Sequence, residues 1–324
     1  MLQFVKNANK IGALICSLVN HLNELESQLI YLERCQRYRE LEPEEGYLEY
    51  GSERKGYIYQ KQKNLKKILQ KDDTQEKIIQ KGAIEFSDVS AAYPTKFGNV
   101  IENMSFTVEP GQKVGIVGRS GAGKSSLIKL LWRVLEPFQG KILVDGQDIS
   151  QFDLKRYRSE ISIISQETTI FQGTLRENID PNHHNCEDKT SEIYTKRETL
   201  INTYLRELGF ANDGYLKDGL SMKVETENSG LSEGEAQVIA FVREIVSPKK
   251  LAIFDEATSN LDLEVELMFQ KKLNLVFQES TVFIIAHKLS NVMDCDKVMV
   301  LSHGVIAEFG EPEKLLADNS SWFY

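Results

Sequence analysis

The residues with the clearest chemical potential form a glycine-rich stretch, GRSGAGKS, at residues 118–125. It fits the phosphate-loop pattern G-x-x-x-x-G-K-[ST], and it lies between an apolar run at residues 113–117 and a helical pattern at residues 126–132, as this motif requires. The glycines let successive backbone N–H groups face a phosphate, and the helix N-terminus adds positive charge. Lys124 would then bridge the β- and γ-phosphates of a nucleotide, and the Ser125 hydroxyl would bind Mg²⁺.

A second chemical element is the apolar run LAIF at residues 251–254, which ends in Asp255 and Glu256. Sheets of α/β proteins bind ligands at the carboxyl ends of their strands. Asp255 is therefore expected to hold magnesium through water, and Glu256 to act as the general base toward an attacking water. The alternative is an ordinary strand end with acidic residues, and the phosphate loop upstream argues against it.

The elements that position these residues begin at residue 82, where near-continuous apolar runs indicate strands buried on both faces. Strands are expected at residues 83–86, 106–108, 113–117, 141–144, 161–164, 251–254, 281–286 and 298–301. Helical patterns separate the later strands, so the sequence predicts an α/β fold with a largely parallel sheet. A hairpin at residues 301–309, turning at His303-Gly304, is expected to close the domain.

Residues 11–41 predict one long amphipathic helix, because apolar residues recur in alternating steps of four and three along its later part. This helix packs either on its own domain or, as we favour, against partner helices outside this chain, since no other helical segment precedes the compact domain. Residues 47–81 are polar and favour a solvated linker. We therefore expect three parts: a helix at residues 1–42, a linker at 43–81 and a domain at 82–324.

Composition excludes several classes of protein. The 324 residues carry a formal net charge of −9, which argues against a nucleic-acid module held by bulk charge. The best apolar run, residues 11–19, has about half of the 18 to 20 residues that a membrane span needs. The four cysteines lack the close spacing of a zinc site, so free thiols are expected.

Between the two chemical elements lies LSEGEAQ at residues 231–237, which resembles the signature segment of ATP-binding cassette (ABC) proteins. Further segments fit that family in the right order. Gln166 resembles the Q-loop glutamine, SNLD at residues 259–262 the D-loop, His287 the switch histidine, and Tyr93 the aromatic residue that stacks on adenine. Plain packing or loop roles are the alternatives for Gln166, His287 and Tyr93.

Finer features are similar to the second nucleotide-binding domain of C-subfamily, multidrug-resistance-associated exporters. These are GIVGRSGAGKSSL at residues 115–127, LRENIDP at 175–181 and the segment at 300–310. Residues 22–41 are similar to the cytoplasmic end of the last transmembrane helix in those exporters. The resemblance implies a RecA-like P-loop NTPase core with an antiparallel β-subdomain and an α-helical subdomain, preceded by one long amphipathic helix.

The resemblance also implies an ATPase that couples Mg-ATP hydrolysis to export of a small molecule, such as an organic anion. Its implied partners are a second nucleotide-binding domain in a head-to-tail dimer and the transmembrane domains of the transporter, at the cytoplasmic face of a membrane. The implied catalytic residues are Glu256, His287 and Gln166, and the implied Mg²⁺ ligands, partly through water, are Ser125, Gln166 and Asp255. The implied ATP-binding residues are Tyr93, Gly118, Ser120, Gly121, Gly123, Lys124, Ser125, Ser126 and Asp255, with Ser232 and Gly234 acting in trans. A soluble ABC ATPase and a truncated regulatory module that binds ATP without turnover are the alternatives.

The signature segment departs from the family pattern, which usually has glutamine where this chain has Glu235. An added carboxylate near a partner's γ-phosphate is repulsive. We therefore expect the site that borrows this signature to be weak, whereas the site built on Lys124 and Glu256 takes its signature from the partner domain.

Overall fold

The computed structural model describes residues 2–40, 77–93, 98–166, 168–181, 192–210, 213–225, 231–258, 260–286, 289–318 and 321–323. Contacts between residues divide the chain into two compact units, Met1–Tyr59 and Gln60–Tyr324. The described part of the first unit is one long helix, and the second unit holds the sheets.

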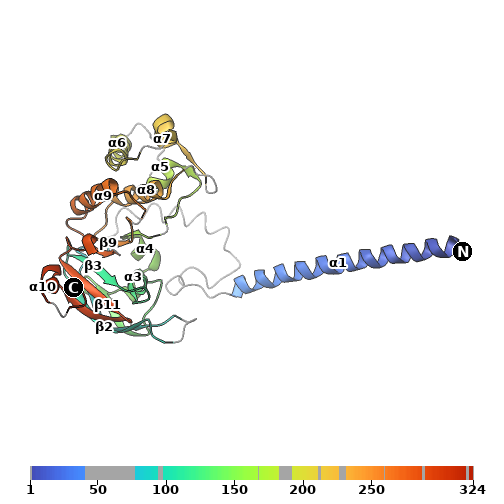
Figure 1. Cartoon of the computed structure of the whole chain (residues 1–324), viewed down its shortest axis with the longest axis horizontal. Helices are drawn as coiled ribbons and strands as arrows, with labels where there is room; N and C mark the ends of the chain where they lie inside the picture. The colour runs from blue at the N-terminus through green and yellow to red at the C-terminus, as the bar shows by residue number, and fades with distance from the viewer. Residues whose placement is uncertain are drawn as a thin grey trace. The chain divides into compact units, whose positions relative to one another are not determined.

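Helix α1 spans Leu2–Glu40 (Figure 1). It begins ahead of the expected start at residue 11, because the preceding segment contains no glycine or proline to interrupt a helix. Its leucine stripe is open to solvent, with Leu18, Leu25 and Leu32 between 54% and 66% exposed. Within the described residues, no helix has the length and the hydropathy to span a bilayer.

The second unit is built around a six-stranded sheet in the order β12-β11-β3-β10-β9-β6. Its neighbouring strands pair in parallel, except that β12 runs antiparallel to β11. The strands are β3 (Lys113–Gly118), β6 (Ile161–Ile164), β9 (Leu251–Asp255), β10 (Thr281–Ile285), β11 (Lys297–Ser302) and β12 (Val305–Gly310). The predicted α/β fold with a largely parallel sheet is confirmed, as is the hairpin that turns at His303-Gly304.

The second sheet is antiparallel and has the strand order β2-β1-β4-β5. Its strands are β1 (Ile84–Ala91), β2 (Ile101–Val108), β4 (Gln139–Val144) and β5 (Gln147–Asp148). Phe106 stacks on Phe86 with ring centroids 4.5 Å apart and meets Phe309 of β12 edge-on at 6.0 Å. These aromatic contacts join the two sheets, and the same core buries Ile79, which precedes Gly82.

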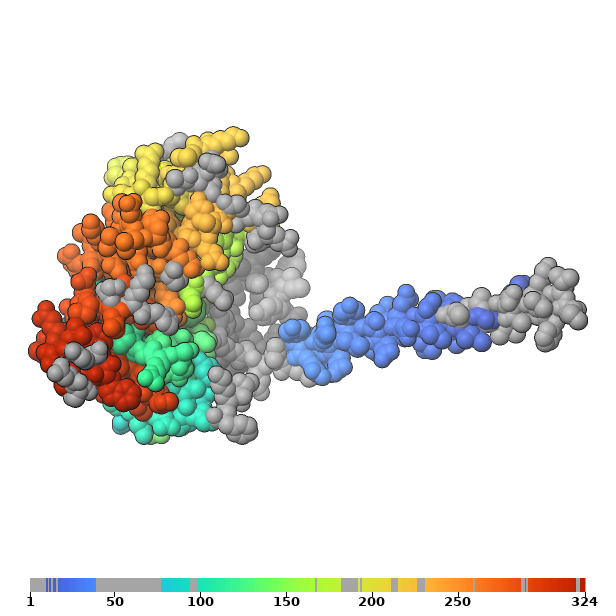
Figure 2. All heavy atoms as spheres, in the orientation of Figure 1, coloured from blue at the N-terminus to red at the C-terminus, as the bar shows by residue number. Residues whose placement is uncertain are grey.

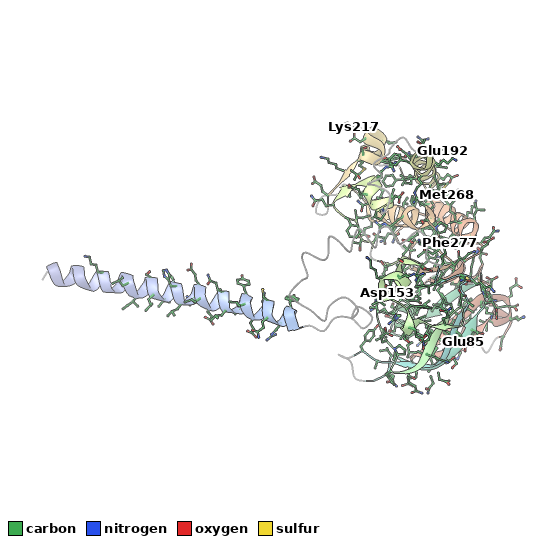
Figure 3. All side chains as sticks on the ribbon, turned by 180° about the vertical axis from the view of Figure 1, so that it is seen from behind. Glu85, Asp153, Glu192, Lys217, Met268 and Phe277 are labelled. Carbon is green, nitrogen blue, oxygen red and sulfur yellow. The ribbon has the colours of Figure 1, made fainter. Side chains whose placement is uncertain are left out.

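Helices between β6 and β10, which lie toward the top of Figure 1 and are mostly yellow to orange in Figure 2, enclose a second cluster of buried apolar side chains. They are α5 (Leu175–Ile179), α6 (Glu192–Glu207), α7 (Asp213–Asp218), α8 (Glu233–Ile245) and α9 (Leu263–Val276). Phe241 of α8 stacks on Phe269 of α9 with centroids 3.6 Å apart, and Phe254 of β9 lies 5.4 Å from Phe277. The end of α9 thus turns Phe277 inward, whereas Met268 faces solvent (Figure 3). These contacts between aromatic side chains hold β9, the strand that carries Asp255, in position.

Short elements complete the described structure. They are α3 (Lys124–Leu131), α4 (Leu154–Ser159), α10 (Pro312–Ala317), β7 (Gly173–Thr174), β8 (Lys223–Val224) and the 3₁₀ turns η2 (Ile149–Gln151), η3 (Gly219–Ser221) and η4 (Leu289–Asn291).

Candidate functional site

The glycine-rich loop joins the end of β3 to the start of α3. Gly121 and Gly123 have φ angles of 79° and 107°, which side-chain-bearing residues rarely adopt. A Cβ at Gly123 would lie 3.1 Å from the Val100 carbonyl oxygen, whereas a Cβ at Gly121 would have no atom within 4 Å. The loop therefore packs tightly on one side and leaves backbone open at Gly121, where an anion could approach it.

Lys124 is the charged centre of this loop. Its Nζ donates hydrogen bonds to the carbonyl oxygens of Gly118 at 2.7 Å and Arg119 at 3.3 Å, and the residue is 9% exposed. No carboxylate of the described chain forms an ion pair with it. The ammonium group and the open backbone of the loop together favour an anionic ligand.

The hydroxyl groups around Lys124 differ in accessibility. Ser120 and Ser125 are exposed, whereas Ser126 is buried and lies with its Oγ 3.2 Å from the Tyr93 hydroxyl. Tyr93 is half-buried, and Lys129 Nζ lies 5.4 Å from the centre of its ring. The structure thus places Tyr93 against α3, and stacking of its ring on adenine stays a prediction.

The sheet order brings the other candidates to the same edge. Strands β3, β10, β9 and β6 are consecutive and parallel, so their carboxyl ends lie side by side. The phosphate loop follows β3, Asp255 ends β9 and is followed by Glu256, and the exposed Gln166 follows β6. His287 follows β10 in the sequence but lies outside the described residues. The parallel topology therefore gathers the loop, both carboxylates and Gln166 at one edge.

Glu256 has an unusual backbone. Its φ angle is 51°, in the left-handed region that is uncommon for residues other than glycine. Its N–H donates to the Ile285 carbonyl oxygen at 3.1 Å, which ties the end of β9 to the end of β10. Both Asp255 and Glu256 are half-buried, so each carboxylate retains access to the edge of the sheet.

The signature segment lies apart from these strand ends, at the N-terminus of α8. Ser232 is the N-cap: its Oγ accepts from the Glu235 N–H at 3.2 Å, and the Glu235 carboxylate accepts from the Ser232 N–H at 2.7 Å. The Ser232 hydroxyl also donates to the same carboxylate oxygen at 3.1 Å. Glu235 is thus turned back on Ser232 in a capping box, an arrangement that the S-x-x-E spacing of residues 232–235 could have predicted.

A neighbouring contact links the signature to the D-loop. A Cβ at Gly234 would lie 3.0 Å from the Asn260 carbonyl oxygen, and the Asn260 N–H donates to Gln237 Oε1 at 3.2 Å. Gln237 is 1% exposed, so this hydrogen bond holds the segment after Glu256 against α8.

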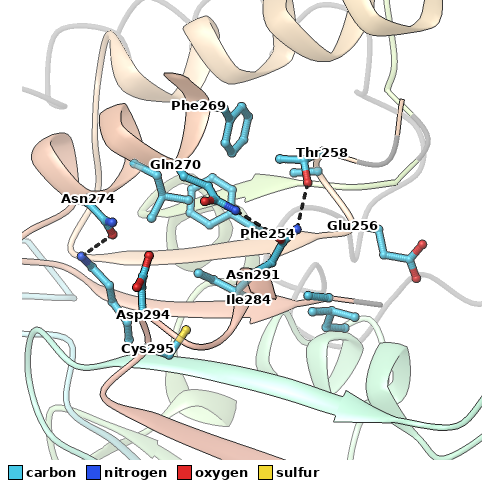
Figure 4. Close-up of a pocket in the computed structure, with 15 residues that line it drawn as sticks. Phe254, Glu256, Thr258, Phe269, Gln270, Asn274, Ile284, Asn291, Asp294 and Cys295 are labelled. Carbon is cyan, nitrogen blue, oxygen red and sulfur yellow. Dashed lines mark hydrogen bonds between the residues drawn. The ribbon is translucent and has the colours of Figure 1, made fainter. Parts of the chain in front are cut away.

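A cavity of about 210 Å³ lies between α9 and the strands β9 and β10 (Figure 4). Glu256 lies at one end of it, and Asn274 and Asp294 lie at the other. Its wall includes the free thiol of Cys295, and burial raises the pKa of this thiol to about 12. Sequence reasoning did not identify the polar residues on this wall, because they come from segments far apart in the chain.

The residues at the strand edge fit a nucleotide with its magnesium ion. Lys124 supplies a positive charge to phosphates, and Ser125, Gln166 and Asp255 present oxygen atoms, which are the ligands that Mg²⁺ prefers. This donor chemistry agrees with the predicted ligand set, whose coordination stays a prediction.

A phosphate loop after a strand of a parallel sheet, with an acidic strand two places along the same sheet, defines a P-loop nucleotide-binding domain. Residues 101–259 match the ABC transporter family. The chain therefore contains an ABC transporter domain, as the resemblance of its signature segment indicated.

Related proteins support the subfamily. Over 251 residues, the chain is 38% identical to Bile pigment transporter 1 of Saccharomyces cerevisiae, a match that covers 75% of this chain and 16% of that protein. Over 246 residues, it is 37% identical to ABC transporter C family member 5 of Arabidopsis thaliana, covering 75% and 15%. The chain therefore resembles C-subfamily transporters and spans about a sixth of the length of these relatives.

A solved structure supports the fold. A bacterial Atm1-family ABC exporter with ATP bound aligns with a TM-score of 0.65 and 29% sequence identity, covering 82% of this chain and 47% of that one. The expected fold of an ABC nucleotide-binding domain is thus confirmed.

Proposed function

We propose that this chain binds and hydrolyses Mg-ATP as the second cassette of a C-type ABC exporter, at the cytoplasmic face of a membrane. The observation that carries the proposal is the strand order β3-β10-β9, because it places the loop with the Lys124 ammonium and the half-buried Glu256 carboxylate at the same edge of the sheet, on either side of the end of β10. The names of the relatives, which include a bile pigment transporter, support export of a small molecule, such as an organic anion.

In this mechanism the loop amides and Lys124 hold the β- and γ-phosphates, which compensates their negative charge. Ser125, Asp255 and Gln166 would hold Mg²⁺, partly through water, and the bound ion would supply further neutralisation of the phosphate charge. Glu256 accepts a proton from a water molecule as that water's oxygen forms a bond to the γ-phosphorus. The bond between the γ-phosphorus and the β,γ-bridging oxygen breaks, and ADP and phosphate are released.

A second cassette completes this site. By family resemblance, the signature of the partner faces the γ-phosphate bound at Lys124, while Ser232 and Gly234 of this chain face the nucleotide bound by the partner. His287 would donate a hydrogen bond to the γ-phosphate, and Tyr93 would stack on adenine. Helix α1, whose leucines are exposed, would pack against helices of the membrane domains.

The test compares Lys124→Ala and Glu256→Gln with the wild-type chain, using equilibrium ATP binding and release of phosphate. We expect Lys124→Ala to abolish binding, because the phosphate charge loses its compensating ammonium, and Glu256→Gln to bind ATP without turnover, because an amide accepts no proton. Lys271→Ala and Glu264→Gln, both at exposed positions of α9, are the matched controls. Wild-type turnover in Glu256→Gln would contradict the general-base role, and ATP binding without turnover by the wild-type chain even with an added cassette that carries an intact signature would favour a regulatory module.

A further inference from the structure

A polar cluster includes Thr258, Gln270 and Asn291, which line the same cavity as Glu256 (Figure 4). Its centre is Glu266 of α9, which is 4% exposed. Glu266 Oε1 accepts hydrogen bonds from Thr258 Oγ1 and from Asn291 Nδ2, both at 3.0 Å. Gln270 Nε2 in turn donates to Asn291 Oδ1 at 3.1 Å. A buried carboxylate requires such donors, so the cluster fixes the positions of the groups that supply them.

The two donors to Glu266 come from the segments that follow β9 and β10. Thr258 lies two residues after Glu256, and Asn291 lies four residues after His287, in η4. Glu266 belongs to α9, whose Phe269 is packed on α8 and is 2% exposed. The carboxylate therefore joins the segment that follows β9 and the segment that follows β10 to one anchored helix.

The backbone of Glu256 needs such support. A residue other than glycine with a φ angle of 51° is held in a sparsely populated conformation, which persists only where the surrounding structure fixes it. The Glu256 N–H to Ile285 hydrogen bond holds one side of this residue. The Thr258 to Glu266 hydrogen bond holds the other side, two residues later.

We propose that Glu266 and Asn291 are positioning residues that keep the Glu256 carboxylate and the segment after β10 in register for attack on the γ-phosphate. This inference rests on the proposed function. The members of the cluster lie outside the phosphate loop, so the cluster acts through the backbone, sets the turnover rate and leaves ATP binding at Lys124 unchanged.

The central test exchanges the hydrogen-bond donor and acceptor between positions 266 and 291. Asn291→Asp alone places a second carboxylate against the buried Glu266 carboxylate. In the double variant Glu266→Gln with Asn291→Asp, the amide introduced at position 266 can donate to the carboxylate introduced at position 291. Gln270 can still donate to that new carboxylate on its other side. Gln270→Ala is the control, because it removes a donor to Asn291 and leaves the link between Thr258 and Asn291 intact.

We expect Asn291→Asp to lower kcat by about tenfold to a hundredfold, the size of effect that a small misplacement of catalytic groups produces. The KM for ATP should stay within about twofold, because the phosphate loop is untouched. The double variant should recover most of the lost kcat, whereas Gln270→Ala should stay near the wild-type value. An unchanged kcat in Asn291→Asp, or a double variant no better than Asn291→Asp, would overturn the proposal.

Amide hydrogen exchange, followed by mass spectrometry on the whole chain, gives a readout that does not need turnover. Asn291→Asp should raise exchange in the peptides covering residues 255–262 and 286–292 together, and the double variant should lower it in both. If the wild-type chain hydrolysed no ATP, the proposed function would fail, and this coupled exchange would still decide whether Glu266 holds the two segments. Exchange that rose in one peptide alone would refute the link.

Discussion

The signature carboxylate offers the sharpest test of how this cassette differs from its relatives. Glu235 binds both the N–H and the hydroxyl of Ser232, the group expected to face the γ-phosphate held by a partner cassette. Glu235→Gln removes the negative charge and keeps a side chain that can still form a capping box, because glutamine serves at this position as well as glutamate. This variant therefore tests the effect of the charge at position 235 without a change in the stability of α8.

The size of the effect follows from the geometry. A phosphate oxygen that accepted a hydrogen bond of about 2.7 Å from Ser232 Oγ would lie no more than about 6 Å from Glu235 Oε2, because that oxygen is 3.1 Å from Oγ. Two unit charges at this distance repel by about 3 kcal/mol at an effective dielectric constant of about 20. Water and counterions reduce this several-fold, to about 1 kcal/mol, or about fivefold in affinity for each site.

The assay is ATP-dependent association of the chain with itself, measured by analytical ultracentrifugation in a Glu256→Gln background that prevents hydrolysis. Both sites of such a dimer use this signature, so Glu235→Gln should lower the dimer dissociation constant by about 25-fold. The gain should shrink at high salt. Glu233→Gln is the matched control, since Glu233 lies in the same turn and is exposed.

Two results would refute this reasoning. Equal gains from Glu235→Gln and Glu233→Gln would mean that net charge on α8 matters and that the contact with Ser232 does not. No gain from Glu235→Gln would place its carboxylate away from the nucleotide in the closed dimer.

Two further predictions concern turnover and stability. Turnover per chain should rise with protein concentration and with an added cassette that carries an intact signature, because two subunits complete each site; in a phosphate-release assay, concentration-independent turnover would favour a self-contained enzyme. Partial burial alone would raise the pKa of Asp145, but hydrogen bonds from the backbone N–H groups of residues 80–83 outweigh it and lower that pKa. Asp145→Asn should therefore cost about 1 to 2 kcal/mol of unfolding free energy at pH 7. Because the folded-state pKa is depressed, this stabilisation is fully present above the unfolded-state pKa of about 4 and is lost as the pH falls through the folded-state pKa; the loss in Asp145→Asn should therefore begin to narrow in urea denaturation below about pH 4, and a loss unchanged in strong acid would contradict it.

The strands of the parallel sheet could be predicted from the sequence, because a strand buried on both faces carries apolar residues at nearly every position. The run at residues 113–117 became β3, and the acidic end of the run at residues 251–254 became the end of β9. The parallel arrangement then placed Lys124 and Glu256 at one edge, so the main candidates followed from residue type and position in the sheet. By contrast, β7 and β8 are too short to produce a periodicity, and the pattern did not reveal them.

Contacts between distant side chains were beyond reach of the sequence pattern. Thr258, Glu266 and Asn291 have no motif in common, and only the packing of α9 brings them together. In the sequence, Glu266 is one of several acidic residues near the start of a helix, and nothing there indicates that it is buried. A buried carboxylate of this kind is recognised by its donors, which are a property of the tertiary structure.

One oxygen of the Glu235 carboxylate affects both the start of α8 and the hydroxyl expected to face a partner's nucleotide. Its Oε2 satisfies the free N–H at the start of α8, which stabilises the helix, and it also accepts the Ser232 hydroxyl hydrogen. A phosphate oxygen that needed this hydroxyl as a donor would compete with Oε2 for the same hydrogen. In this chain the Ser232 hydroxyl therefore cannot donate fully to both the Glu235 carboxylate and a partner's nucleotide. Glu235 thus weakens the contact with the nucleotide in two ways, by its charge and by accepting the hydroxyl hydrogen. A glutamine at this position would keep the cap but hold the hydroxyl less strongly, because a neutral acceptor forms a weaker hydrogen bond than a carboxylate.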